Sequence, residues 1–194
     1  DVLYILFTSG STGTPKGVTV AHKSLIAYTE WVSSEFSMTE EDIIGNQTPF
    51  YFSMSTLDIY QTIRNGATMY IISKQLFSFP IRLLEYIHEK QINFIYWVPS
   101  ALCLPVNFRA LGKRDISCLK TILFAGEVMP TKQLNAWIKE LPSAKFANLF
   151  GPTEVTDICS FYRIDRKLSD TECVPIGHAC QNSDLIILNS EDKE

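Results

Sequence analysis

Short apolar runs alternate with amphipathic stretches along most of this chain. The apolar runs are rich in β-branched and aromatic side chains, which is typical of buried strands. They lie at residues 2–7, 17–21, 43–48, 68–73, 93–98, 119–124 and 144–150. Between most of them, apolar side chains recur at helical spacing, which predicts helices at residues 22–37, up to residue 65, at residues 80–91 and from residue 131. This alternation predicts an α/β fold with a mostly parallel sheet and covering helices.

Two parts of the chain depart from that alternation. The stretch around Pro105 is the least regular, because a proline interrupts a helix. From residue 158 onward, apolar runs predict strands without intervening helices, the last of them at residues 185–188. We therefore expect an α/β subdomain over residues 1–157, followed by a β-rich segment over residues 158–194 that begins another subdomain.

The loops at one edge of the predicted sheet carry the polar residues that suggest a function. Ligands of open α/β sheets bind outside the carboxyl ends of the strands. The loops expected at that edge follow Thr8, Thr48, Val98, Phe124 and Leu149. A site built from these loops would bring together segments that are far apart in the sequence.

The first of these loops indicates phosphate binding. It lies between two predicted strands and has the sequence Thr8-Ser9-Gly10-Ser11-Thr12-Gly13-Thr14-Pro15-Lys16-Gly17. Its glycines let the backbone turn tightly and bring N–H groups close to a ligand. Its hydroxyl groups can donate to anionic oxygens, and Lys16 adds a positive charge. A hydroxyl-rich linker is the alternative interpretation.

This loop matches neither of two common phosphate-binding motifs. A P-loop has Gly-Lys-Ser/Thr at its end and a helix that opens at the lysine. Here Pro15 precedes Lys16, Gly17 follows it, and a strand comes next. The Gly-x-Gly-x-x-Gly fingerprint of dinucleotide-binding folds is also absent from the sequence.

A second polar segment follows the predicted strand at residues 144–150. Its sequence is Asn148-Leu149-Phe150-Gly151-Pro152-Thr153-Glu154. An amide and an aromatic ring can read a base, a hydroxyl can bond a phosphate, and a carboxylate is a hard oxygen ligand suited to Mg²⁺. Taken alone, the segment is better explained as a turn with a carboxylate at the start of a helix.

On these residues the chain resembles the adenylate-forming ligases. Residues 4–17 are similar to the phosphate-loop signature of that superfamily, which includes acyl-CoA synthetases, luciferases and amino-acid adenylation domains. Residues 148–154 resemble its adenine-binding motif, with Phe150 where tyrosine is commoner. Residues 124–130 resemble a segment that packs beside the nucleotide and the acyl pocket. Residues 121–177 look most like the D-alanine–carrier-protein ligases, which are relatives of nonribosomal-peptide adenylation domains.

The resemblance implies a two-step activation of a carboxylic acid, with an amino acid such as D-alanine as the expected substrate. The carboxylate attacks the α-phosphate of ATP, and a phosphopantetheine thiol on a carrier protein then takes the acyl group. Lys16 would hold the β- and γ-phosphates, Thr153 would bond the α-phosphate, and Glu154 would hold Mg²⁺. Further nucleotide contacts are expected from Thr8, Ser9, Gly10, Ser11, Thr12, Gly13, Thr14, Gly126, Glu127, Asn148, Phe150 and Gly151.

The resemblance also implies an acyl pocket in which this chain departs from the family pattern. The expected pocket residues are Phe52, Ser53, Ala125, Leu149, Asp157 and Ile158. Amino-acid-activating relatives carry an aspartate at the position of Ser53, where it pairs with the ammonium of the substrate. Either the substrate lacks that amine, as an aryl or hydroxy acid would, or Asp157 supplies the missing carboxylate. The alternative for Asp157 is that it points to solvent or caps a turn.

Composition adds expectations about partners and compartment. The net charge of −4 and the 46% hydrophobic content are those of an ordinary globular protein, so we expect neither nucleic acid nor membrane insertion. The sequence opens without a signal peptide, and its apolar runs are shorter than the roughly 20 residues of a membrane helix. Five cysteines without a Cys-x-x-Cys pair favour reduced thiols in a cytoplasmic protein.

The resemblance covers essentially the whole chain but only the middle of a family enzyme. The family's ribose-binding aspartate and the lysine of its small C-terminal domain are expected beyond residue 194, so this chain alone is expected to be nearly inactive. Two alternatives remain open at this point. One is an aryl-acid, hydroxy-acid or acyl-CoA-type ligase, and the other is a nucleotide-binding regulatory domain without turnover. A phosphoryl-transferring ATPase is disfavoured because the chain has no P-loop.

Overall fold

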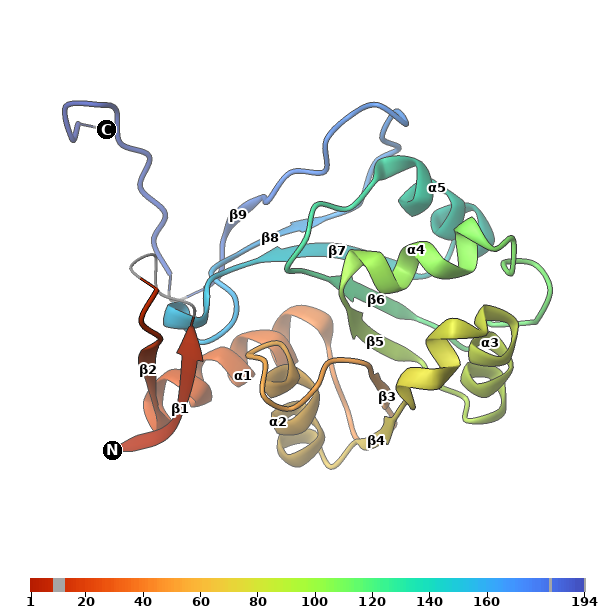
Figure 1. Ribbon diagram of the computed structural model, residues 1–194, viewed down its shortest axis with the longest axis horizontal. Helices are drawn as coiled ribbons and strands as arrows, with labels where there is room; N and C mark the ends of the chain where they lie inside the picture. The colour runs from red at the N-terminus through yellow and green to blue at the C-terminus, as the bar shows by residue number, and fades with distance from the viewer. Residues whose placement is uncertain (9–12, 182, 194) are drawn as a thin grey trace.

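A seven-stranded sheet forms the centre of the computed structural model, which describes residues 1–8, 13–181 and 183–193 (Figure 1). The strands lie in the order β4-β3-β5-β6-β7-β8-β9. Strands β3 to β7 are parallel to one another, and β8 and β9 extend the sheet in antiparallel fashion. Their bounds are β3 Ile43–Asn46, β4 Thr68–Ile71, β5 Phe94–Trp97, β6 Thr121–Phe124, β7 Lys145–Phe150, β8 Ser160–Arg163 and β9 His178–Ala179. The expected mixed α/β fold with a mostly parallel sheet is confirmed.

Helices cover both faces of this sheet (Figure 1). Helices α1 and α2 lie on one face, whereas α3, α4 and α5 lie on the other. Their bounds are α1 His22–Phe36, α2 Ser55–Asn65, α3 Pro80–Glu89, α4 Pro99–Asn107 and α5 Thr131–Glu140. Two short 3-10 helices complete the described elements, η1 Lys74–Ser78 and η2 Thr153–Val155.

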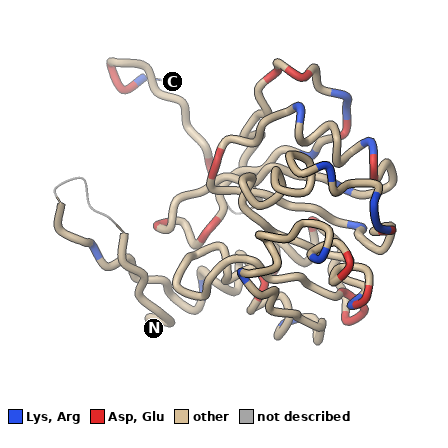
Figure 2. The backbone as a smooth tube through the Cα atoms, turned by 45° about the vertical axis from the view of Figure 1, so that its right-hand side comes forward, with Lys and Arg blue, Asp and Glu red and all other residues tan. Residues whose placement is uncertain are grey.

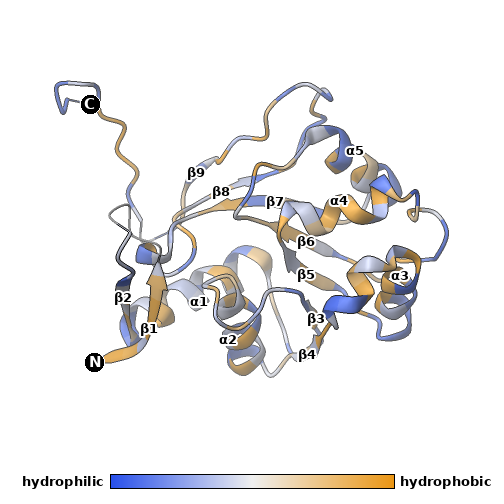
Figure 3. Ribbon diagram, in the orientation of Figure 1, coloured by the Kyte–Doolittle hydropathy of each residue, from blue (hydrophilic) through white to orange (hydrophobic). Residues whose placement is uncertain are grey.

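Successive residues of the central strands supply two separate cores. In β5, Phe94 and Tyr96 pack toward α1 and α2, whereas Ile95 and Trp97 pack toward α3, α4 and α5. Successive side chains of a strand point to opposite faces, so a strand buried on both sides is apolar throughout. Figure 3 shows this apolar character along the middle strands. The continuous apolar runs in the sequence reflect this three-layer arrangement.

The first two strands form a hairpin apart from the central sheet. Strand β1 Val2–Thr8 pairs antiparallel with β2 Lys16–Ala21, and Thr8 lies opposite Lys16. The expectation that the loop after Thr8 follows a strand of the parallel sheet is therefore wrong. A hairpin satisfies its own backbone hydrogen bonds, and it reaches the rest of the molecule through α1 and through a contact between β2 and η2.

Two further expectations are corrected by the structure. Residues around Pro105 form the regular helix α4, because a proline in the last turn disrupts only one backbone hydrogen bond. Residues 185–188 form no strand, and their apolar side chains are exposed. The division of the chain at residue 157 stays a prediction, although β8 and β9 join the same sheet as β7.

The surface of the described chain carries both signs of charge. Figure 2 shows Lys and Arg interspersed with Asp and Glu around the α/β body. Six ion pairs, all with partly or well exposed partners, join some of these residues within the described ranges. No described helix combines the length and the apolar character needed to cross a membrane.

Candidate functional site

Loops from four parallel strands meet at the carboxyl edge of the sheet. The backbone N–H of Val98, after β5, donates to Oε1 of Gln47, after β3, at 3.3 Å. Gly126, after β6, lies beside Met54 and Val98 and has a left-handed φ of 87°. Because a side chain there would be strained and would approach Met54, glycine suits this position. The loops after residues 48, 98, 124 and 149 therefore lie at one edge of the sheet, as expected for parallel strands.

Glu127 joins two of these loops directly. Its carboxylate accepts from the backbone N–H of Ser100 at 2.8 Å and from the Ser100 hydroxyl at 3.0 Å. Ser100 lies in the first turn of α4, where backbone N–H groups lack partners within the helix. Glu127 therefore caps α4 from the neighbouring loop, and this contact gives it a structural role.

The connection between β7 and β8 folds tightly on itself. An added Cβ at Gly151 would lie 2.3 Å from the carbonyl oxygen of Asp157 and 2.6 Å from the Cα of Ile158. Two consecutive residues, Thr156 and Asp157, have left-handed φ values of 62° and 84°. Non-glycine residues adopt this conformation rarely and at a cost. The strained turn directs Asp157 into the protein, where its exposed fraction is only 1%.

The hydroxyl-rich loop lies at the tip of the β1–β2 hairpin. Thr8 and Lys16 end the two strands opposite each other, and Gly13 has a left-handed φ of 79° with open space around it. Gly13, Thr14 and Lys16 are exposed. The expected ligand contacts of Ser9, Gly10, Ser11 and Thr12 lie outside the described residues. Because β2 contacts η2, the hairpin and the segment around Thr153 and Glu154 are neighbours.

The residues of the second polar segment have different environments. Asn148 is buried, and its Nδ2 donates to the carbonyl of Pro175 at 2.8 Å, so this amide tethers the chain that leads to β9. Phe150 is about half exposed, which leaves a ring face available for stacking. Thr153 is half-buried in η2, and Glu154 is exposed.

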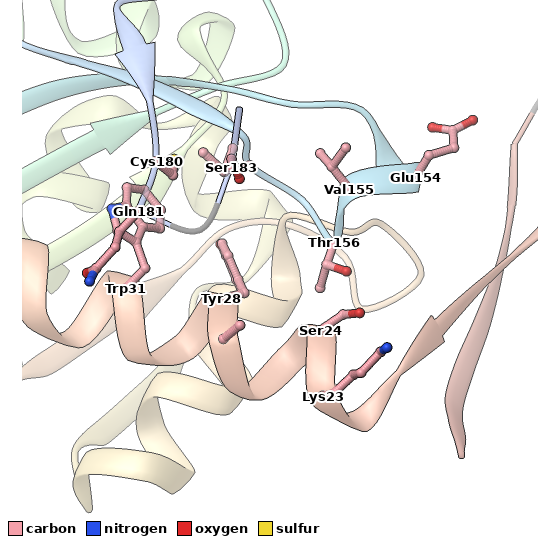
Figure 4. Close-up of a pocket in the computed structure, with 12 residues that line it drawn as sticks. Lys23, Ser24, Tyr28, Trp31, Glu154, Val155, Thr156, Cys180, Gln181 and Ser183 are labelled. Atoms are coloured by element: carbon pink, nitrogen blue, oxygen red, sulfur yellow. The ribbon is translucent and has the colours of Figure 1, made fainter. Parts of the chain in front are cut away.

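A cavity of about 420 Å³ lies between α1 and this segment (Figure 4). Figure 4 shows Tyr28 and Trp31 on its helical side, Val155 and Thr156 opposite, and Cys180 and Ser183 beside them. Lys23 and Glu154 lie at its margin, and the Glu154 carboxylate points away from the two aromatic rings. The cavity thus joins the first turns of α1 to the turn that follows β7.

Most of the expected acyl-pocket residues share one buried cluster. Ala125, Leu149 and Ile158 are all less than 5% exposed and pack together with Met54 and Tyr96. Ser53 is half-buried. Its hydroxyl lowers the pKa of the Asp157 carboxyl, so the two side chains lie close together. Phe52 does not join them. It is exposed and packs on Tyr51, with 4.7 Å between the ring centroids.

Two tyrosines hold the carboxylate of Asp157. The hydroxyl of Tyr28 in α1 donates to Oδ2 at 2.8 Å, and that of Tyr96 in β5 donates to the same atom at 3.1 Å. Burial raises the pKa of Asp157 to about 6, although the hydrogen bonds from Tyr28 and Tyr96 oppose this shift. Burial, together with the nearby Asp157 charge, raises the pKa of both tyrosines well above its usual value.

A second carboxylate, Asp58, is buried close to the first. Its Oδ2 accepts from Nδ2 of Asn46 at 2.8 Å, whereas its Oδ1 has no hydrogen-bond partner among the described residues. Burial, together with the charge of Asp157, raises the pKa of Asp58 to about 8, although the hydrogen bond from Asn46 opposes this shift. The hydroxyl of Tyr4 in β1 is also buried and has no hydrogen-bond partner in the part of the chain that the structure describes, and burial and Asp157 raise its pKa to about 12.

The sequence pointed to Asp157, but it gave no site role to the buried polar side chains around it. Tyr28 and Tyr96 fall at apolar positions of a helix and a strand, so they read as ordinary core aromatics. A buried tyrosine hydroxyl needs a hydrogen-bond partner, which is the one signal that could have drawn attention to them. Asp58 could have been noticed in a similar way, since a carboxylate on the buried face of an amphipathic helix is rare unless it has a partner.

Comparisons with known proteins agree with this arrangement. The sequence profile of AMP-binding enzymes matches residues 1–194. A D-alanine–D-alanyl carrier protein ligase from Bacillus cytotoxicus is 30% identical over 97% of this chain and 38% of its own length. An L-proline–[L-prolyl-carrier protein] ligase from Pseudomonas fluorescens is 34% identical over 95% of this chain and 37% of its own length.

A solved structure shares the fold closely. The crystal structure of the Vibrio cholerae adenylation domain AlmE, in complex with glycyl-adenosine-5'-phosphate, superposes with a TM-score of 0.88 at 27% identity. The match covers 99% of this chain and 36% of that one, so the chain spans little more than a third of these relatives' length. Since the family profile matches its whole sequence, the chain belongs to the AMP-binding enzyme family.

Proposed function

We propose that the protein activates a carboxylic acid with ATP to form an acyl-adenylate and transfers the acyl group to the phosphopantetheine thiol of a carrier protein. One observation carries this proposal: β2, which follows the hydroxyl-rich loop, contacts η2, which contains Thr153 and Glu154. The two polar segments expected to bind phosphate are therefore neighbours, and the buried carboxylate of Asp157 follows the second of them directly. The names of the relatives, which are acid–carrier protein ligases, support the same activity.

The described residues fit a triphosphate at the hairpin tip. Lys16 is exposed and forms none of the ion pairs found among the described residues, so its charge is available to an anion. Lys16 and the hydroxyl loop would hold the β- and γ-phosphates, and Thr153 would bond the α-phosphate. Phe150 would stack on the adenine, which its exposed ring allows.

The described residues also fit Mg²⁺ held partly by the nucleotide. They contain no group of three metal-ligating side chains, and Glu154 is one exposed carboxylate without an ionic partner among them. Magnesium commonly takes one or two carboxylates, with phosphate and water oxygens completing its shell. When bound, the ion would neutralise part of the charge on the phosphates.

The chain's own contribution to the reaction is positioning and charge neutralisation. The acid would lie in the pocket formed by Ser53, Ala125, Leu149 and Ile158, with its carboxylate toward Thr153. Holding the carboxylate and the phosphate together removes much of the entropic barrier to their reaction. Lys16 would stabilise the negative charge that leaves with pyrophosphate, which is the kind of preorganised contact that accelerates such transfers.

A small amino acid is the proposed substrate, and D-alanine is one candidate. The relatives are named for D-alanine and L-proline, and the solved neighbour holds a glycyl adenylate. An aryl or hydroxy acid is the second candidate, because Ser53 carries no charge with which to bind an ammonium. An acyl-CoA-type ligase would share the first step and differ only in the thiol acceptor.

Pyrophosphate exchange in the full-length protein tests the proposed function. Label from pyrophosphate should appear in ATP only when an acid substrate is present, because only reversible adenylate formation couples the two. An ATPase that transfers the γ-phosphoryl group would release phosphate without returning label. A regulatory domain would bind ATP and give neither result. Absence of exchange with every acid in a panel of amino, hydroxy and aryl acids would refute the proposal.

A further inference from the structure

A buried carboxylate without a cationic partner lies under the proposed acid pocket. Asp157 is 1% exposed, and none of the ion pairs among the described residues involves it. A charge removed from water is costly unless an opposite charge and hydrogen bonds compensate it. Tyr28 and Tyr96 supply hydrogen bonds but no positive charge, so the compensation within the described chain is incomplete.

Both tyrosine bonds reach the same oxygen. Tyr28 donates to Oδ2 at 2.8 Å and Tyr96 at 3.1 Å, so the tyrosines leave Oδ1 to another donor. The two hydroxyls come from α1 and β5, two elements that are far apart in the sequence and pack in the same buried cluster. This clamp holds the carboxylate in one orientation and aligns Oδ1 without neutralising it.

Other buried polar groups near Asp157 also lack hydrogen-bond partners among the described residues. Asp58 is fully buried, its Oδ1 has no hydrogen-bond partner among the described residues, and burial and the nearby Asp157 charge raise its pKa. The Tyr4 hydroxyl is likewise buried, has no hydrogen-bond partner within the described ranges, and lies near Asp157. Buried polar groups in native proteins are nearly always hydrogen-bonded, so unmatched ones indicate a missing partner.

We propose that Asp157, clamped by Tyr28 and Tyr96, binds the ammonium group of the acid substrate and makes the enzyme selective for amino acids. This inference rests on the proposed function and decides between its two substrate classes. The hydroxyl of Ser53 is near Asp157, so it can accept or donate beside the bound ammonium. The left-handed backbone at Thr156 and Asp157 is consistent with a side chain that is held inward against conformational preference.

Among the buried carboxyl and tyrosine groups near Asp157, Asp157 itself is the one that carries a charge. Burial raises its pKa only to about 6, whereas burial raises the pKa of Asp58 to about 8. The pKa values of Tyr28 and Tyr96 lie well above the usual tyrosine value, and that of Tyr4 rises to about 12. At pH 7 the cluster therefore presents one carboxylate, from Asp157, together with a protonated Asp58 and neutral tyrosines. One negative charge matches one ammonium.

The test compares an amino acid with its hydroxy counterpart in the full-length protein. Pyrophosphate exchange is measured with glycine, D-alanine, L-proline and β-alanine, and with glycolate, D-lactate and benzoate. Wild-type protein should use at least one amino acid and reject the matching hydroxy acid about 100-fold, since a site built to bind a polar group discriminates strongly against its absence. Asp157→Asn keeps the shape and removes the charge, so it should erase most of that selectivity.

Two controls separate substrate binding from folding. Asp165→Asn removes a carboxylate outside this cluster and should leave the selectivity ratio unchanged. Wild-type protein supplies a measurement without any substitution: below pH 6 the KM for the amino acid should rise about tenfold per pH unit, whereas the KM for ATP should stay nearly constant. Ser53→Asp combined with Asp157→Asn should restore part of the selectivity, because it returns a carboxylate to the same pocket.

Each result has a definite meaning. An equal loss of exchange with amino and hydroxy acids in Asp157→Asn, together with a flat amino-acid KM below pH 6, would overturn the inference and give Asp157 a structural role. Exchange of wild-type protein with hydroxy or aryl acids alone would overturn it and leave the proposed function standing. Absence of exchange with every acid would overturn the proposed function itself, and the inference with it.

Discussion

At the scale of single residues, the site depends on backbone conformations that side chains do not favour. Gly151 permits the carbonyl of Asp157 to approach closely, and Thr156 and Asp157 adopt left-handed conformations just after η2. Such strain persists only where surrounding contacts impose it. Here the hydrogen bonds from Tyr28 and Tyr96 are two of those contacts.

Gly151→Ala is expected to destabilise the protein by about 1–3 kcal/mol or more, as overpacking of a tight site does. The added methyl would meet backbone atoms of Asp157 and Ile158 that cannot rotate away. Urea unfolding of wild type and variant measures the change. Gly13→Ala is a matched control for steric crowding, because its Cβ would meet open space and only its φ of 79° would oppose it. An unchanged midpoint in Gly151→Ala would show that the turn relaxes.

Lys16→Ala and Glu154→Ala are each expected to slow adenylate formation in the full-length protein. Each removes one charge from a site that would gather phosphates and a metal, which is worth about 2–4 kcal/mol of barrier. Both residues are exposed, so folding should be largely intact by circular dichroism. Acid-dependent pyrophosphate exchange at saturating acid gives the rates. Full activity in both variants would return these two residues to an ordinary solvated surface.

Some residues of the buried site were predictable from the sequence, and others were not. The resemblance to the adenylate-forming ligases singled out Asp157 as a pocket candidate, because it implied an acyl-pocket position there and an aspartate missing at Ser53. The partners of that carboxylate were not predictable, because Tyr28 and Tyr96 are 129 and 61 residues away along the chain. Their hydroxyls become meaningful only once α1 and β5 pack on the same face of the sheet.

At the scale of elements, neighbouring loops are joined by side chains that complete helix ends. Glu127 bonds the N-terminal turn of α4, and Asn148 tethers the segment before β9. These contacts link loops that the parallel sheet already brings to one edge. They also give structural roles to two residues that were expected to contact the nucleotide.

Glu127→Ala is expected to lower the free energy of unfolding by about 0.5–2 kcal/mol, the usual cost of removing a helix cap. The backbone N–H and hydroxyl of Ser100 would lose their acceptor, and water would replace it only in part. Glu127→Gln keeps one acceptor oxygen and should cost less. Urea midpoints rank the three proteins. An alanine variant as stable as wild type would show that this cap is dispensable.

Element types were predictable wherever the apolar pattern was long, as in α1 and in the buried strands. The misses have physical causes. Pro105 suggested an interruption, yet α4 is completed around it by burial of Ala101, Leu102 and Cys103. Residues 185–188 carry a strand-like pattern, but within the described chain they pair with no strand. We expected β1 to belong to the parallel sheet, because the sequence pattern of a strand does not reveal which strand it pairs with.

At the scale of the whole molecule, the two buried carboxylates should make stability depend on pH. Their pKa values in the folded protein, about 8 for Asp58 and about 6 for Asp157, lie above the value of about 4 expected in the unfolded chain. The folded state therefore binds more protons between pH 4 and 8, and the free energy of unfolding must fall as pH rises through this range. Each pKa unit corresponds to about 1.4 kcal/mol.

The urea midpoint of the protein should accordingly be higher at pH 5 than at pH 8. Asp58→Asn should flatten this dependence, because the amide cannot ionise and its oxygen can still accept from Asn46. The exposed carboxylates Glu85 and Asp115, whose pKa values are lowered by hydrogen bonds from Arg114 and Ser117, act in the opposite sense only below about pH 4. A midpoint that rises between pH 5 and pH 8 would contradict the buried charges described here.

The fate of the acid's oxygen atoms tests the central claim, adenylate formation, most directly. The full-length protein is incubated with ATP, the carrier protein and an acid labelled with ¹⁸O in its carboxylate, and AMP is analysed by mass spectrometry. If the carboxylate attacks the α-phosphate, one labelled oxygen must remain on AMP after the thiol takes the acyl group. Formation of ADP, or of AMP without label, would contradict the account.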